Sequence, residues 1–300
     1  MGGCEARSGG RSTRARFLEQ ALAIEAVDAR SAGELGSMPK IFVQATLPHS
    51  RPKCHDFERG NGRFSLHLTA PPSVGLPYGT YPRLVLAWLT TEAVRTKSPE
   101  IRLGPTFSHF MYSLGLTPVT GKRGTVNRLR DQLHRLFSTT IRWTYTDEDK
   151  GRASGRGLVI AGQHELWWSP GDPAQQPFWR SRVVLGREFF DEITGSSVPV
   201  DLRALRLLKR SPLALDIYVW LTYRMSYLRR PCLIPWDALR TQFGADYSRT
   251  RDFQVRFCSQ MPQVIGVYPD LRVETAQTGV LLKPSPTHIC RTRPRAEMGS

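Results

Sequence analysis

The chain has 300 residues, of which 40% are hydrophobic and 10% aromatic, enough for the cores of about two folded domains. Its formal net charge of +16 implies a polyanionic partner, either nucleic acid or an anionic membrane surface. This composition excludes a disordered chain. No apolar run approaches the ~20 residues that cross a bilayer. Residues 1–16 carry arginines without an apolar segment, so we expect no signal peptide.

The cysteines predict neither disulfides nor a metal centre. The chain has five, an odd number, and no Cys-x-x-Cys pair, whereas disulfide frameworks and zinc sites use paired spacings. Reduced thiols are typical of a cytoplasmic protein. We therefore expect a cytoplasmic chain that contains no metal, with Cys4, Cys54, Cys232, Cys258 and Cys290 as free thiols.

Residues 1–70 are predicted to form a flexible basic N-terminus followed by a short helix and strand extension. Residues 14–33 are rich in Ala, Glu and Leu, which favours a helix. Residues 40–48 and 63–71 alternate and end at proline, as strands do. The residues between them form a turn-rich loop. We expect this extension to mediate self-association.

Residues 71–195 are predicted to form a first domain. An apolar helix over 83–97 is followed by a short strand at 100–104 and a helix over 105–116. The helix over 124–140 then carries an apolar stripe, and strands at 141–145 and 157–168 flank a polar loop that we interpret as a long wing. The outer face of the third helix fits a DNA major groove, although in isolation an ordinary amphipathic surface helix explains it better. Its stripe consists of Val126, Leu129, Leu133, Leu136 and Phe137.

Residues 196–290 are predicted to form a second domain with the same plan, followed by a tail at 291–300. We place the boundary at 196–200, within a strand-plus-helix connector. An apolar helix over 211–228 precedes a short helix that ends at Gly244. Ser248 is expected to cap a helix with the stripe Phe253, Phe257, Met261 and Val264. Strands at 266–269 and 271–284, with a turn at 277–279, complete the domain.

The two domains share one order of elements. Each domain is predicted to contain an apolar helix, a short extended segment, a helix that ends in glycine, a helix with a basic face and a hairpin. This order is typical of a winged helix-turn-helix, whose second helix in the motif enters the DNA major groove. We therefore predict an α+β protein with two tandem winged helix-turn-helix domains and the N-terminal extension.

The sequence contains none of the common catalytic motifs. The turn over 120–124 lacks the first glycine and the Ser or Thr of a phosphate-binding loop. No His-x-His, HExxH or GxSxG occurs. Tyr247 could act as a nucleophile, but without a supporting His or acidic cluster a phosphate contact explains it better. We expect no catalysis and no cofactor, and a relaxase or recombinase remains the enzymatic alternative.

Candidate DNA contacts divide into those that position the protein and those that read bases. Cations at turns and wings are expected to neutralise phosphates, namely Lys122, Arg123, Arg152, Arg156, Arg272 and Lys283. Base reading is expected from the second helix, with Ser248, Arg251 and Val255 opposite the stripe and Arg249 and Gln254 on its flanks. The remaining candidates are Thr125, Asn127, Arg128, Arg130, His134 and Arg135 on the first helix, Tyr247, and Gln277 in the second wing.

Several strings in order resemble the plasmid-encoded RepA replication initiators, over about residues 17–289. They are GLPYGTYPRLVLAWLTTEAVRTKS, RLRDQLHRLF, QFGADY, DFQVRF, VYPDLRVE and GVLLKPSP. The resemblance implies tandem winged helices that bind double-stranded origin repeats (iterons), open the duplex and recruit host initiator and helicase, with autoregulation and plasmid copy control. It also implies a homodimer in equilibrium with a monomer and association with the plasmid or nucleoid. By position, it places the DNA contacts on 125–138, 248–261 and the wing near Gln277. The alternative is a winged-helix transcriptional repressor without initiator activity. An RNA-binding protein is disfavoured, because no aromatic RNA platform appears.

Overall fold

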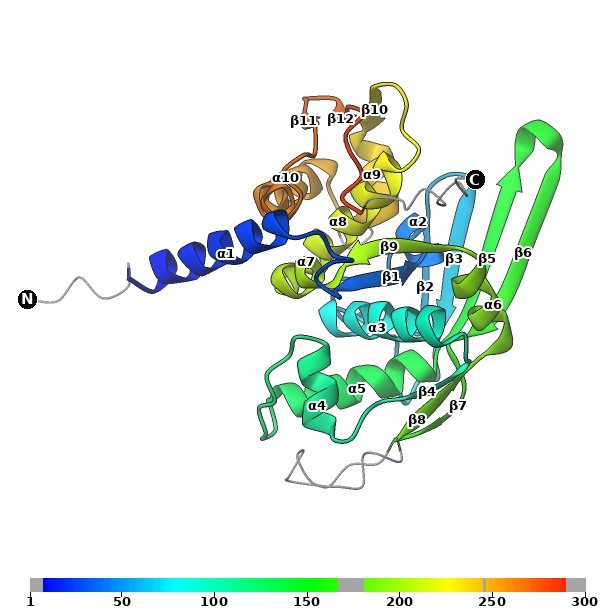
Figure 1. The fold of residues 1–300 in the computed structure, drawn as a ribbon. Helices are drawn as coiled ribbons and strands as arrows, with labels where there is room; N and C mark the ends of the chain where they lie inside the picture. The colour runs from blue at the N-terminus through cyan, green and yellow to red at the C-terminus, as the bar shows by residue number, and fades with distance from the viewer. Residues whose placement is uncertain (1–7, 167–180, 245–246, 290–300) are drawn as a thin grey trace, which may run out of the picture.

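Two similar units and an N-terminal extension make up the fold, which is α+β (Figure 1). The computed structural model describes residues 8–166, 181–244 and 247–289. One continuous cluster of buried hydrophobic side chains runs from the extension through both units. Residues far apart in the sequence therefore share a core, and the predicted α+β class is confirmed.

The first unit begins with α3 (Thr80–Thr96), whose side chains are buried on nearly every face. It continues through β4 (Glu100–Arg102), α4 (Phe107–Ser113) and α5 (Thr125–Phe137), and later through β7 (Ala161–Glu165) and β8 (Arg182–Leu185). The Thr106 hydroxyl caps α4 by accepting a hydrogen bond from the His109 amide at 3.0 Å. Its three strands are antiparallel in the order β4-β8-β7.

The second unit repeats this order. It consists of α8 (Pro212–Met225), β10 (Cys232–Pro235), α9 (Trp236–Phe243), α10 (Thr250–Val267), β11 (Val273–Thr275) and β12 (Gly279–Leu282). Its strands are antiparallel in the order β10-β12-β11. In both units the first strand is at one edge and the last strand is in the middle. The shared plan inferred from the sequence therefore extends to the strand order.

A four-stranded antiparallel sheet joins the extension to the first unit. Its order is β2 (Asp56–Gly60), β3 (Phe64–Thr69), β5 (Thr140–Asp147) and β6 (Arg152–Val159), with a short 3-10 turn, η1 (Glu148–Lys150), between the last two. The β5–β6 hairpin projects from the body (Figure 1). β5 and β6 pair antiparallel and form the hairpin that was expected to be the first wing, and β5 also pairs with β3. The hairpin that completes the three-stranded sheet is β7–β8, and its tip at 167–180 lies outside the described residues.

The extension also joins the second unit. Its strand β1 (Leu35–Pro39) pairs antiparallel with β9 (Ser197–Asp201), which follows α6 (Arg187–Gly195). The helix α1 (Ser8–Ala26) packs on α7 (Leu202–Leu208) and on α10. The predicted boundary at 196–200 thus coincides with a strand bound to the extension. Four expected elements differ from the structure. Residues 40–48 contain α2 (Ile41–Gln44) rather than a strand, and the loop expected after them contains β2. The polar loop expected between 145 and 157 contains most of β6, and residues 266–267 end α10.

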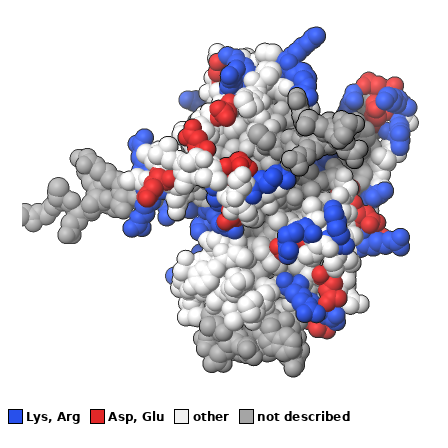
Figure 2. All heavy atoms as spheres, viewed as in Figure 1, with Lys and Arg blue, Asp and Glu red and all other residues white. Residues whose placement is uncertain are grey.

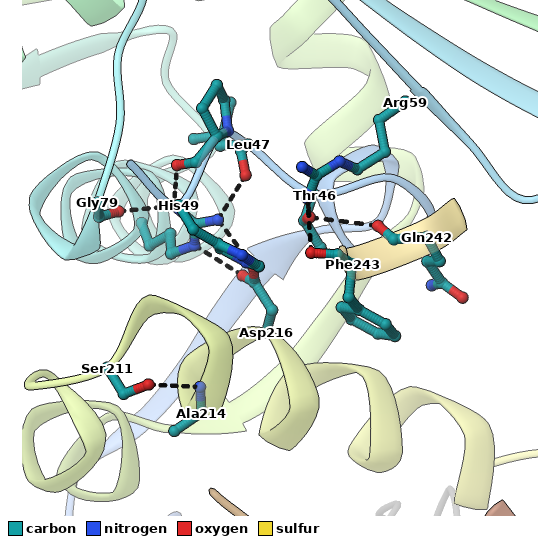
Figure 3. A network of polar contacts seen from close by, with 12 residues as sticks. Thr46, Leu47, His49, Arg59, Gly79, Ser211, Ala214, Asp216, Gln242 and Phe243 are labelled. Atoms are coloured by element: carbon teal, nitrogen blue, oxygen red, sulfur yellow. Dashed lines mark hydrogen bonds and ion pairs between the residues drawn. The ribbon is translucent and has the colours of Figure 1, made fainter. Parts of the chain in front are cut away.

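A buried polar network fastens the two units together (Figure 3). The Asp216 carboxylate on α8 accepts hydrogen bonds from Arg83 Nε and Nη2 on α3, both at 2.7 Å. It also bonds His49 Nε2 at 2.8 Å. Arg83 donates further to the carbonyls of Leu47 at 2.7 Å and Gly79 at 2.6 Å. One carboxylate therefore connects the first helix of each unit with the extension.

The charges in this network balance within the core. Burial alone would raise the pKa of Asp216, but Arg83 and His49 hold it below its ordinary value. Burial lowers the pKa of His49, against the opposing effect of Asp216. A second group of contacts joins the extension to the second unit. Arg59 Nη1 donates to Thr46 Oγ1 and to the Phe243 carbonyl at the end of α9. The extension thus contributes to the core from Ile24 onward.

Candidate DNA interface

The outer face of α5 is exposed along its length. The apolar stripe of Val126, Leu129, Leu133, Leu136 and Phe137 is buried, as predicted. Asn127, Arg128 and His134 are exposed on the opposite side, and Lys122 and Arg123 are exposed in the turn before the helix. Four of these five residues form a mostly cationic surface in and before the first turn of α5, and His134 lies in its last turn.

The turn before α5 is held by its own hydrogen bonds. Thr125 Oγ1 donates to the Thr117 carbonyl at 2.6 Å and accepts from the Val119 amide at 2.9 Å. A side chain at Gly124 would be impossible without movement, because its Cβ would lie 2.1 Å from the Val119 carbonyl oxygen. Thr125 is therefore occupied with the turn, and its role is to present Lys122 and Arg123.

Two arginines of α5 do not project freely outward. Arg135 was expected on the outer face, but it is only 8% exposed. Its Nε donates to Asp131 Oδ2 at 2.8 Å, and its guanidinium lies 5.6 Å from the Tyr78 ring centre. Arg130 is half-buried, its pKa is lowered by burial, and its Nη1 lies 3.4 Å from Asn127 Oδ1. Arg135 thus packs inside the fold, because the helix turns it beneath the segment before α3.

The corresponding helix of the second unit, α10, also presents an exposed row. Phe253, Phe257, Met261 and Val264 are buried, as predicted. Arg251 and Ser248 are exposed, Gln254 is half-buried, and Val255 is 66% exposed. An exposed apolar side chain among polar ones suits the methyl group of thymine.

The start of α10 differs from the expected capping. The N-cap position is Arg249, without a side-chain cap, and Ser248 precedes it. Instead, Thr250 Oγ1 donates to Asp237 Oδ1 on α9 at 2.9 Å and fixes the angle between the two helices. Tyr247 is half-buried, with its ring edge-on to Phe253 at 5.7 Å between centroids. Arg249 remains exposed beside the helix start.

The β11–β12 hairpin of the second unit, which was expected to be its wing, is short. Gln277 is exposed in the turn between β11 and β12, and Arg272 is exposed just before β11. Lys283 Nζ forms an ion pair with Glu274 across the hairpin. Lys283 must therefore leave a carboxylate before it can contact a phosphate, whereas Arg272 has no ion pair among the described residues.

Sequence reasoning missed a group of cations away from both helices. Basic side chains gather along α1 and at the place where α1 leaves the body, beside α7 (Figure 2). They belong to Arg14 and Arg16 on α1 and to Lys209 and Arg210 after α7. Their sequence signal is weak, since two adjacent cations in a helix connection are common on protein surfaces.

No other chemistry stands out in the described ranges. No group of three or more His, Cys, Asp or Glu side chains there could hold a metal ion. No helix among those residues has the length and apolarity that crossing a bilayer requires.

Comparison with known proteins places the chain in a family. Residues 76–238, more than half of the chain, match the model of the family described as plasmid encoded RepA protein. In fold, the chain is similar to the crystal structure of domains 2 and 3 of RctB, with a TM-score of 0.52 and 12% identity over 84% of this chain and 99% of that one. A second structure of RctB domains 2–3 gives a TM-score of 0.49 and 14% identity over 81% and 96% of the chains. No curated protein matches in sequence. The chain belongs to the family of plasmid-encoded RepA proteins.

Proposed function

We propose that this protein initiates plasmid replication by binding repeated sequences in double-stranded origin DNA through two winged helices. The observation that carries the proposal is the repeated order of helix, strand, two helices and hairpin, with the same strand order in both sheets. That order is the plan of a winged helix. Membership in the RepA family and the net charge of +16 support the same function.

The two exposed helices divide the work of recognition. On α10, Arg251 suits guanine and Val255 suits a thymine methyl group, so this helix reads bases. On α5, the cations gather in the turn at Lys122 and Arg123 and at Arg128, where phosphate contacts are the natural use. We therefore assign sequence preference mainly to α10 and backbone binding mainly to the first unit.

Opening of the duplex needs no catalytic group in this proposal. The network around Asp216 and the pairing of β1 with β9 keep the two units in one arrangement. A protein that holds two grooves rigidly can impose a bend, and flexible A·T-rich steps adjacent to the sites yield at low energetic cost. Binding energy at several repeats would then stress the neighbouring duplex.

The partners in this proposal are origin DNA and the host initiator and helicase, in the cytoplasm with the plasmid. A homodimer in equilibrium with a monomer would separate repression of the protein's own promoter from initiation. The second candidate is a repressor of the same fold, which the two similar units and the net charge of +16 favour as much as they favour the initiator. The two differ in their DNA sites, because a repressor dimer binds inverted repeats.

Footprinting the plasmid segment that flanks the gene tests the proposal. An initiator should protect several direct repeats, and a transformation assay with that segment should yield plasmids only when the protein is supplied. Protection of a single inverted repeat, with no replication, would favour the repressor. Nicking of supercoiled DNA in the presence of Mg²⁺ would instead indicate an enzyme.

A further inference from the structure

Two clefts meet at the turn that follows α7. The first lies between the start of α3, the outer face of α5 and this turn, and its lining includes Thr125, Arg128, Lys209 and Arg210. The second lies between α1, α7 and the C-terminal half of α10, and its lining includes Arg14, Arg16 and Gln263 together with the same Lys209 and Arg210. The two clefts therefore share Lys209 and Arg210.

The charge in these clefts is not balanced by acids. Among the described residues, the second cleft is lined by five basic side chains and by no Asp or Glu, the basic ones being Arg14, Arg16, Arg206, Lys209 and Arg210. Only Arg206 has a carboxylate partner there, with Nη1 at 2.7 Å from Glu34 Oε1. In the first cleft, Asp131 is already bound to Arg135. The turn after α7 is thus a cationic surface that an anion could bind.

Lys209 shows the effect of this imbalance. It is half-buried, and its ammonium donates to the Gly115 carbonyl. Burial and the neighbouring Arg210 and Arg206 lower its pKa. A bound anion would relieve the repulsion between these cations. Arg210 is itself exposed and has no ion pair among the described side chains.

The position of the clefts relates them to both DNA-reading helices. The exposed row on α10 runs through Arg251, Val255 and Ser259 to Gln263, which lines the second cleft. The exposed face of α5 begins at Arg128, which lines the first. In Figure 1, α7 lies between α10 and α5. A DNA segment that runs between the two helices on this side of the molecule would pass this turn.

We propose that Lys209, Arg210, Arg14 and Arg16 bind the phosphate backbone of the DNA segment that connects the two grooves occupied by α5 and α10. This inference rests on the proposed function and adds a third contact region to it. The ligand is the phosphodiester backbone of duplex DNA, since Arg and Lys side chains line both clefts and such cations neutralise phosphates. Phosphate contacts of this kind fix the spacing of the two units without reading sequence.

The test compares salt dependence of binding for full-length variants. The probe is a mixed-sequence duplex of about 30 bp, long enough for two grooves one helical turn apart. Each lost phosphate contact should make the slope of log K against log salt shallower by about 0.9. We expect this change for Arg210→Ala, and up to about twice that change for the Arg14→Ala/Arg16→Ala double variant. Arg210→Lys should restore the slope, and Arg187→Ala, exposed on α6, serves as the matched control.

Hydroxyl-radical footprints of the same variants on the plasmid origin give a second readout. Loss of backbone protection between the two groove contacts, with the base preference unchanged, is the expected result. Wild-type slopes in both Arg210→Ala and the double variant would overturn the inference while leaving the proposed function intact. A wild-type protein that binds no duplex would overturn the proposed function, and this inference with it. Urea unfolding midpoints equal to that of the wild type establish that the variants are folded. If the double variant is not folded, the salt slope of Arg210→Ala alone decides the test.

Discussion

Substitution of Asp216 by alanine should strongly destabilise the protein. Asp216 is 7% exposed and its partner Arg83 is 3% exposed. The carboxylate accepts two bonds from Arg83 and one from His49. Removing it leaves a buried guanidinium with backbone carbonyls alone. Breaking a buried ion pair from one side costs about 3–5 kcal/mol.

Urea denaturation with linear extrapolation measures this loss. Glu92→Ala is the control, because it removes a surface ion pair with Arg95, whose side chain is 67% exposed, and such pairs contribute at most about 1 kcal/mol. The double variant Arg83→Met/Asp216→Leu should cost less than Asp216→Ala, since it leaves no unpaired charge. If Asp216→Ala costs no more than Glu92→Ala, the network does not fasten the two units.

Three further predictions concern DNA contacts, the extension and pH. Arg251→Ala should weaken specific binding by about 1–3 kcal/mol and relax one base position, whereas Lys122→Ala should weaken all duplexes alike and flatten the salt slope; equal behaviour in binding assays would contradict this division. A chain lacking residues 1–34 should stay folded and lose self-association, whereas a chain lacking residues 1–70 should not fold. Circular dichroism measures the folding, and sedimentation velocity measures the self-association. An unchanged sedimentation profile for the shorter deletion would contradict the role of the extension in self-association. The pKa of His49 in the folded chain lies below 6.5, so the unfolded chain binds a proton on this side chain at a higher pH than the folded chain does. The free energy of unfolding should therefore fall as pH drops below about 6.5. His49→Gln should reduce that fall in urea titrations at several pH values, and an unchanged pH dependence would exclude His49 as its source.

Local patterns in the sequence were sufficient for α5 and α10, although they predicted a strand where α2 forms. The stripes of α5 and α10 repeat at helical spacing and are buried as predicted, because each stripe covers the same core from one side. The common order of elements in the two units followed from these helices and from the glycines that end them. The α+β class could therefore be predicted without knowledge of which strands pair.

The pairing of the strands could not be predicted from local patterns in the sequence. Alternation in β5 and β6 indicated a hairpin, but it could not reveal that β3 would bind its other edge, since pairing between distant segments is set by tertiary packing. β2 was missed because Asp56, Glu58 and Arg59 read as a polar loop. Arg59 is nevertheless buried, at 2% exposure, through its bonds to Thr46 and the Phe243 carbonyl.

Charged residues on the candidate interface were the hardest to assign. Helical spacing placed Arg135 on the outer face of α5, yet a neighbouring acid and the Tyr78 ring draw it inside. Conversely, Lys209 and Arg210 show no periodicity, and only their position between two clefts distinguishes them. Charge in the sequence predicts a polyanionic partner, but the fold decides which cations can reach it.

The central claim is that two winged helices bind repeated origin DNA together. Hydroxyl-radical and methylation footprinting of the plasmid segment flanking the gene tests it most directly. The account predicts several direct repeats, each with two protected major-groove segments about one helical turn, or 10–10.5 bp, apart. Protection of a single groove in each site, or no protection at any salt concentration, would contradict it.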